Sequence, residues 1–142
     1  MNDALSNQDT PIEPQWVESG ANRARWRVDG VLQVVLGDAG HAEGATYAER
    51  DGREALDLVG NLVGGAVNVL NMTDIRRVKK TTARVLRLQS HPSTARLALL
   101  TGSPVSRMLG NAYLSITKLK HPTRLFTDEG SAVAWLLEGL DD

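Results

Sequence analysis

At 142 residues the chain is long enough to bury the core of one domain, and its 42% hydrophobic and 23% charged residues exclude a largely disordered or collagen-like protein. It has no cysteine, which excludes disulfides, thiolate metal sites and cysteine nucleophiles. The net charge is -1, but acidic and basic residues occupy different parts of the chain.

Residues 1–22 are polar and acidic without a hydrophobic period, so we expect a flexible N-terminal tail followed by one domain over 23–142. Trp16-Val17 is an apolar pair in this tail, and it is expected to dock on the domain or on a partner. The chain begins without the basic and apolar pattern of a signal peptide, and no later run is long enough to cross a bilayer. These features favour a cytoplasmic protein.

The predicted domain opens with a β-hairpin. Apolar and basic residues alternate over 24–28, Asp29-Gly30 follows, and 31–36 is rich in strand-forming residues. An Asp-Gly pair between two such runs predicts a two-residue type I′ turn, in which both central residues have positive φ.

A helix and a buried strand are expected next. Thr46 and Glu49 have capping-box spacing, which predicts a helix start, and Gly64-Gly65 predicts its end. Its expected apolar face is Leu56, Val59, Leu62 and Val63. The short apolar run 66–71 predicts a buried strand, and 79–89 has the spacing of a second helix.

The C-terminal part predicts two further strands and two further helices. Residues 95–100 and 123–126 indicate strands. Ser103 as N-cap and Pro104 at the first helical position predict a helix that keeps its apolar spacing to Ile116. Asp128-Glu129 opens the last helix with acids near the positive end of its dipole.

This order predicts a layered α/β fold. Helical crossovers join the later strands, so we expect a mixed, mostly parallel sheet of about five strands with an N-terminal hairpin and about four helices.

Three stretches, 67–75, 102–111 and 122–129 with Ala134-Trp135-Leu136, resemble the STAS or SpoIIAA-like family of anti-sigma-factor antagonists, and within it an uncharacterised actinobacterial branch. The resemblance extends from Ala24 to Leu140. It implies a SpoIIAA-like fold and a bacterial regulator whose partner is a protein, of a kinase-like or anti-sigma type, with a homodimer as one expected assembly.

In phosphoregulated members of that family, an Asp-Ser-Ser/Thr-Gly run opens a helix and its first Ser accepts a phosphate. The corresponding run here is Lys79-Lys80-Thr81-Thr82, with Lys80 at the acceptor position and Lys79 at the Asp. A shift of one residue would place Thr81 at the acceptor position instead. The resemblance therefore implies a domain without the usual acceptor serine, and a phosphate on Thr81 would pair with nearby lysines and Arg84 instead of repelling them.

The chain lacks the patterns that mark common catalytic and metal sites, including Gly-x-Ser-x-Gly, His-Glu-x-x-His and a complete phosphate loop. His41 lies near Asp38 and Glu43 but has no second histidine at ligand spacing. We expect no enzyme activity, no metal and no cofactor.

From Ile75 to Thr127 there is no Asp or Glu, and this acid-free stretch holds Arg76, Arg77, Lys79, Lys80, Arg84, Arg87, Arg96, Arg107, Lys118, Lys120 and Arg124. Such asymmetry indicates an anionic partner, or neutralisation by the acidic segments across the fold or across a dimer. Nucleic acid is disfavoured, because Tyr113 and Phe126 are the only aromatic residues available there for stacking. A membrane is disfavoured because the apolar face of the basic helix is needed for the core.

We therefore expect a non-enzymatic regulatory domain that binds a protein where strand ends meet helix starts. The expected contact residues are Met72, Thr73, Arg76, Arg77, Arg84, Ser103, Ser106 and Arg107. The alternative is a domain that binds a small anionic ligand, such as a nucleotide, a phosphometabolite or a lipid head group, near Ser103 and the basic helix.

Overall fold

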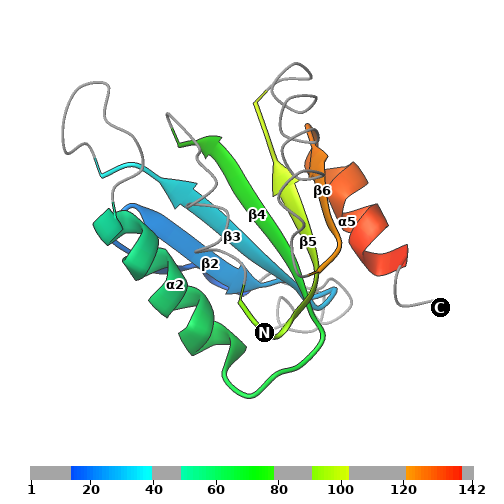
Figure 1. Ribbon diagram of the computed structural model, residues 1–142, viewed down its shortest axis with the longest axis horizontal. Helices are drawn as coiled ribbons and strands as arrows, with labels where there is room; N and C mark the ends of the chain where they lie inside the picture. Colours follow the sequence, from blue (N-terminus) through cyan, green and yellow to red (C-terminus); the bar gives the residue numbers. More distant parts are fainter. Residues whose placement is uncertain (1–13, 40–48, 79–90, 103–120, 139–142) are drawn as a thin grey trace, which may run out of the picture.

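The computed structural model describes residues 14–39, 49–78, 91–102 and 121–138. These residues form one six-stranded sheet and two helices (Figure 1). In chain order the elements are β1 (Val17–Ser19), β2 (Asn22–Trp26), β3 (Val31–Gly37), α2 (Glu49–Val63), β4 (Val69–Arg77), β5 (Thr94–Leu100), β6 (Thr123–Phe126) and α5 (Glu129–Glu138).

The strands stand in the sheet in the same order as in the chain. β1, β2 and β3 pair antiparallel, and β3, β4, β5 and β6 pair parallel. The predicted mixed, mostly parallel sheet is confirmed, but it has six strands and not about five. The helices predicted over 79–89 and 103–116 lie outside the described residues.

The two described helices pack on opposite faces of the sheet. α2 contacts β1, β2 and β3, whereas α5 contacts β4, β5 and β6, as Figure 1 shows. Side chains alternate along β3, so Leu32 belongs to the core cluster that includes α2 while Val31 belongs to the cluster that includes α5. Neither helix in the described part of the chain is long and apolar enough to cross a membrane.

α2 buries Ala55, Leu58, Val59 and Val63 along one face, at the spacing expected for an amphipathic helix. Leu56, expected on this face, is only half-buried. Each fully buried Leu or Val contributes about 1.5–3 kcal/mol to stability, so this face is enough to hold the helix on the sheet.

Polar contacts fix both ends of α2 to β2. At its start, the buried Asn22 donates from Nδ2 to the carbonyl oxygen of Asp51 at 2.9 Å and accepts from the Gly37 backbone N–H at 3.2 Å. Near its end, the Trp26 indole N–H donates to the carbonyl oxygen of Leu62 at 2.8 Å. These bonds set the position of α2 along the hairpin.

The predicted tail over 1–22 is wrong in its last part. Val17–Ser19 forms β1, and Asn22 begins β2. The sequence is polar there because β1 is a short edge strand with exposed side chains at Val17 and Glu18, so it carries no hydrophobic period. Trp16 docks on the domain, against arginines of β2.

The hairpin is confirmed, but its turn differs from the predicted type. Gly30 has a positive φ of 87°, while Asp29 does not have a positive φ. The Gly30 N–H donates to the Arg27 carbonyl oxygen at 3.0 Å, and the Arg27 N–H donates to the Val31 carbonyl oxygen at 2.8 Å. This geometry is a turn closed by a glycine bulge, which needs one positive φ instead of two.

β4 runs further than the predicted strand over 66–71. It begins at Val69 and continues to Arg77 through Thr73 and Asp74, which are polar but buried. These residues resemble a strand end in sequence, yet both have hydrogen-bond partners in the fold. The strand therefore continues where composition alone indicates a break.

Candidate functional site

Two of the predicted contact residues are not available to a partner. Met72 and Thr73 lie in the middle of β4, and both are 0% exposed. The prediction placed them at a strand end, but β4 continues beyond them to Arg77. Their assignment to a contact surface is therefore wrong.

Arg76 and Arg77 do lie at the carboxyl end of β4, and both are exposed. Arg76 is held by Asp74, with Nη2 2.6 Å from Oδ2 and Nε 3.0 Å from Oδ1. This hydrogen bonding raises the pKa of Arg76 above its ordinary value. The side chain of Arg77 makes no hydrogen bond or ion pair within the described residues, so its charge is free to meet a partner.

The other predicted site residues lie outside the described residues. They are Lys79, Lys80, Thr81, Thr82, Arg84, Ser103, Ser106 and Arg107. One argument for a ligand site at the strand ends also does not hold for this sheet. Such crevices form where the strand order of an open sheet reverses, and the order of the described strands never reverses.

The sequence prediction missed a group of polar residues on the α5 side of the sheet, over β2 and β3. Ala24 belongs to the core cluster with α2, and Trp26 packs against it, so the alternating Arg23 and Arg25 point to the opposite face. Gln33 lies directly across from Arg25 in the β2–β3 register. The signal was the alternation of arginines over 23–27, which indicated a strand but not which helix would cover which face.

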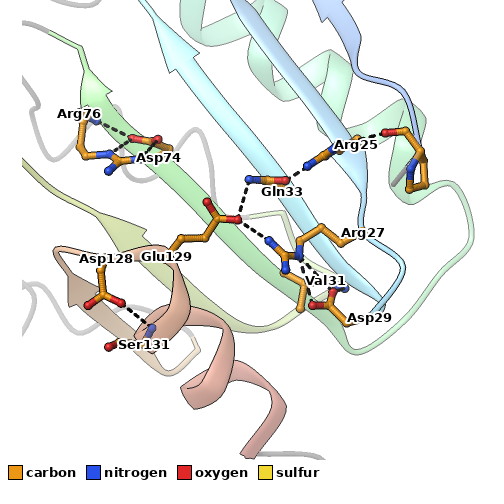
Figure 2. A network of polar contacts seen from close by, with 11 residues as sticks. Arg25, Arg27, Asp29, Val31, Gln33, Asp74, Arg76, Asp128, Glu129 and Ser131 are labelled. Carbon is orange, nitrogen blue, oxygen red and sulfur yellow. Dashed lines mark hydrogen bonds and ion pairs between the residues drawn. The ribbon is translucent and has the colours of Figure 1, made fainter. Parts of the chain in front are cut away.

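A chain of polar contacts joins this face to the start of α5 (Figure 2). Arg25 Nε donates to Gln33 Oε1 at 3.0 Å, and Gln33 Nε2 donates to Glu129 Oε1 at 3.3 Å. Glu129 also pairs with Arg27, which in turn pairs with Asp29 at 3.2 Å. Arg27 is thus neutralised by two acids and acts as a structural residue.

Arg23 and Arg25 are not neutralised in this way. Their guanidinium carbons lie 4.3 and 4.4 Å from the centroid of the Trp16 ring. In the described part of the chain, neither makes an ion pair with a carboxylate. We call Trp16, Arg23 and Arg25 the arginine–tryptophan cluster.

Within the described residues, most arginines of the acid-free stretch make no ion pair with an acidic residue. Arg76 is its one member with an ion pair there, to the neighbouring Asp74. Arg96 lies 4.0 Å from the ring centroid of Trp135 and donates to its carbonyl oxygen at 2.7 Å. Arg124 lies 5.6 Å from the ring centroid of Phe126. Arg77, Arg96 and Arg124 therefore make no ion pair with an acidic residue in the part of the chain that the structure describes.

The comparisons with solved structures identify the fold. The chain is similar to an uncharacterised protein of the DUF3478 family from Shewanella loihica PV-4, described as having a SpoIIAA-like fold. The TM-score is 0.53 with 13% identity, over 89% of this chain and 97% of that one. It is also similar to a protein of unknown function from Arthrobacter sp. FB24, with 30% identity over 87% of this chain and 96% of that one and a TM-score of 0.29.

The chain has a SpoIIAA-like α/β fold, as the resemblance implied. A search of curated proteins finds no match. A family model, described as a domain of unknown function, matches residues 66–139, which run from the loop before β4 to the end of α5. The chain belongs to this family, DUF7793.

Proposed function

We propose that this protein is a cytoplasmic, non-enzymatic regulatory domain that binds an acidic surface of a protein partner through the end of β4 and the basic residues that follow it. The observation that carries the proposal is Arg77, an exposed and unpaired cation at the carboxyl end of a central parallel strand. The sequence continues from it into Lys79, Lys80 and Arg84.

Arg76 supports the proposal because Asp74 holds its guanidinium in a two-point contact at the same strand end. A fixed arginine loses little side-chain entropy on binding, and its remaining donors suit carboxylates of a partner. The resemblance implies a kinase-like or anti-sigma-type regulator as the class of partner. The alternative, a small anionic ligand near Ser103, concerns residues outside the described part.

The proposal is tested by site-specific photo-crosslinking. A photo-reactive residue at position 39, an exposed position just after the end of β3 beside Arg77, is expected to capture one protein reproducibly from the native host, and the same residue at position 53, on the exposed side of α2, is not. With the captured protein purified, Arg77→Glu should lower its association rate about tenfold or more at low salt, and Arg53→Glu should leave it unchanged. Equal rates for both variants would contradict the proposed surface.

Whether Thr81 or Thr82 is phosphorylated is measured separately. If the captured partner is a kinase, intact-mass analysis after incubation with ATP shows whether one phosphate is added, and fragmentation locates it on Thr81 or Thr82. A phosphate on Thr81 is expected to strengthen contacts with Lys79, Lys80 and Arg84. Phosphorylation that releases the partner would instead match the switch of the acceptor-serine proteins.

A further inference from the structure

We propose that the arginine–tryptophan cluster binds a phosphate group. Its residues lie on β2 and just before β1, at one edge of the sheet. The cluster is therefore separate from the surface proposed above at the end of β4. The inference does not depend on that surface, and neither the sequence patterns nor the family match, which begins at residue 66, points to it.

The geometry places two cations against one aromatic ring. Both guanidinium carbons lie within 4.4 Å of one point, the centroid of the Trp16 ring. The two arginines alternate along β2, so both side chains leave the same face of the sheet. The proposed phosphate accepts hydrogen bonds from both, in the forked arrangement that arginine offers to phosphate.

The donors of the cluster are only partly used. Arg25 donates from Nε to Gln33 and from Nη1 to the Pro14 carbonyl oxygen at 3.3 Å, which fixes its orientation and leaves Nη2 without a partner. The side chain of Arg23 makes no hydrogen bond within the described residues, and its Nε is buried without a partner. The cluster is thus half-buried, oriented and short of acceptors.

The charge of the cluster selects the ligand. Two adjacent positive charges on one strand face repel each other, and a buried donor without an acceptor destabilises the free protein. A phosphate carries close to two negative charges and several acceptor oxygens, so one group relieves both effects. A carboxylate carries one charge and would neutralise one arginine only.

Glu18 is the intramolecular competitor of this ligand. It lies directly across from Arg23 in the β1–β2 register, so its side chain leaves the same face of the sheet. Its side chain is exposed and makes no ion pair with Arg23. An exposed carboxylate of this kind holds an arginine weakly, which leaves the position open to a phosphate.

The first test needs no variant. In the ¹⁵N-labelled full chain, the arginine Nε–Hε signals are followed by NMR while inorganic phosphate is added, with sodium chloride at the same ionic strength as reference. The proposal expects saturable shifts for Arg23 and Arg25 and none for Arg50 and Arg53 on α2. The absence of shifts at Arg23 and Arg25, or equal shifts at all four, would overturn it, and the cluster would then serve only to dock β1.

Variants supply the second test, with phosphate affinity measured by the same titration on backbone amides of β2. Arg23→Gln should weaken binding roughly 10- to 100-fold, because a charged hydrogen-bond donor is lost. Glu18→Gln should tighten it by up to about fivefold, because the competitor is removed. Arg53→Gln, whose side chain is 72% exposed, removes the same charge elsewhere and should change nothing.

If Arg23→Gln weakens the fold, the wild-type and Glu18→Gln titrations still decide the question. Equal weakening by Arg53→Gln and Arg23→Gln would show a general charge effect and reject the site. Repeating the titration with O-phosphoserine separates the sources of the group. Equal affinity would mean that the cluster binds phosphate alone, and tighter binding would mean that it binds a phosphate ester.

Discussion

Asn71 and Thr73 are polar side chains placed in the apolar core on the α2 side of the sheet. Both are 0% exposed. Asn71 lies between Leu32 and Leu97 in the strand register. Thr73 Oγ1 donates to Asn71 Oδ1 at 2.6 Å, but Asn71 Nδ2 has no partner in the described part of the chain. The pair is therefore only partly satisfied and holds β4 in place at some expense of stability.

We predict strong non-additivity for this pair. Thr73→Val leaves Asn71 without its donor and should lower the free energy of unfolding by about 1–3 kcal/mol. The double variant Asn71→Leu, Thr73→Val removes both polar groups together and should lie within ~1 kcal/mol of the wild type or above it. Urea denaturation of the wild type, the single variants Thr73→Val and Asn71→Leu, and the double variant measures this, and additive losses would contradict it.

His121 gives the stability a pH dependence. Its Nε2 is buried without a partner among the described residues, and burial lowers the pKa of its imidazole below the ordinary 6.5. The unfolded chain therefore takes up a proton first as the pH falls. Stability should be highest above 6.5 and should decline as the pH falls from there toward the lower folded pKa.

This is checked by measuring the urea concentration at the midpoint of unfolding at several pH values between about 7.5 and 5.5, the range in which histidine normally titrates. His121→Gln, which does not titrate, should show a smaller decline across this range than the wild type. The same decline in both proteins would mean that other groups cause it.

At the scale of elements, the sequence correctly predicted the strand and helix ends that depend on neighbouring residues. β6 has the predicted bounds, and α5 begins after Asp128, whose Oδ2 accepts from the Ser131 N–H at 2.8 Å and whose pKa is lowered by that bond. β1 and the second half of β4 were missed because contacts with other strands, and not their own composition, stabilise them. Trp16 stacks on β2, and Thr73 is buried by neighbouring strands.

Two glycine substitutions should have opposite effects because they lie in different elements. Gly30 has a φ of 87° in the hairpin turn, so Gly30→Ala should destabilise by about 1–2 kcal/mol. Gly60 lies inside α2, where an added Cβ meets nothing within 4 Å, so Gly60→Ala should stabilise by about 0.5–1 kcal/mol. Thermal unfolding of both variants tests the signs. A stabilised Gly30→Ala would show that the turn is not the glycine bulge described above.

At the scale of the whole molecule, α2 covers one face of the sheet over β1, β2 and β3, and α5 covers the other face over β4, β5 and β6. This arrangement decides which residues can form a site. The arginine–tryptophan cluster could not be predicted from the sequence, since Arg23 and Arg25 face away from α2 only because Ala24 and Trp26 pack under it. Of the described residues expected at the strand-end surface, two are exposed and two are buried. Arg77 is exposed as expected, while Met72 and Thr73 are buried by the continuation of β4.

The matched region of the family, residues 66–139, is not expected to fold alone. The core cluster on the α2 side combines Val69, Ile75 and Leu97 with residues of β2, β3 and α2. A fragment over 66–142 would expose these side chains and leave β4 as an unpaired edge. Its ¹H–¹⁵N spectrum should lack the dispersion of the full chain. A dispersed spectrum and a cooperative urea transition would contradict this prediction.

The unbroken strand order has a consequence for how the protein is made. As the ribosome releases the chain, each new strand finds its neighbour already present at the growing edge, and none has to insert between two earlier ones. Assembly can therefore proceed in one direction, from the N-terminal hairpin outward. α5, which follows β6 in the chain, then brings Glu129 back to Arg27 beside the turn between β2 and β3 and joins the two ends of the sheet.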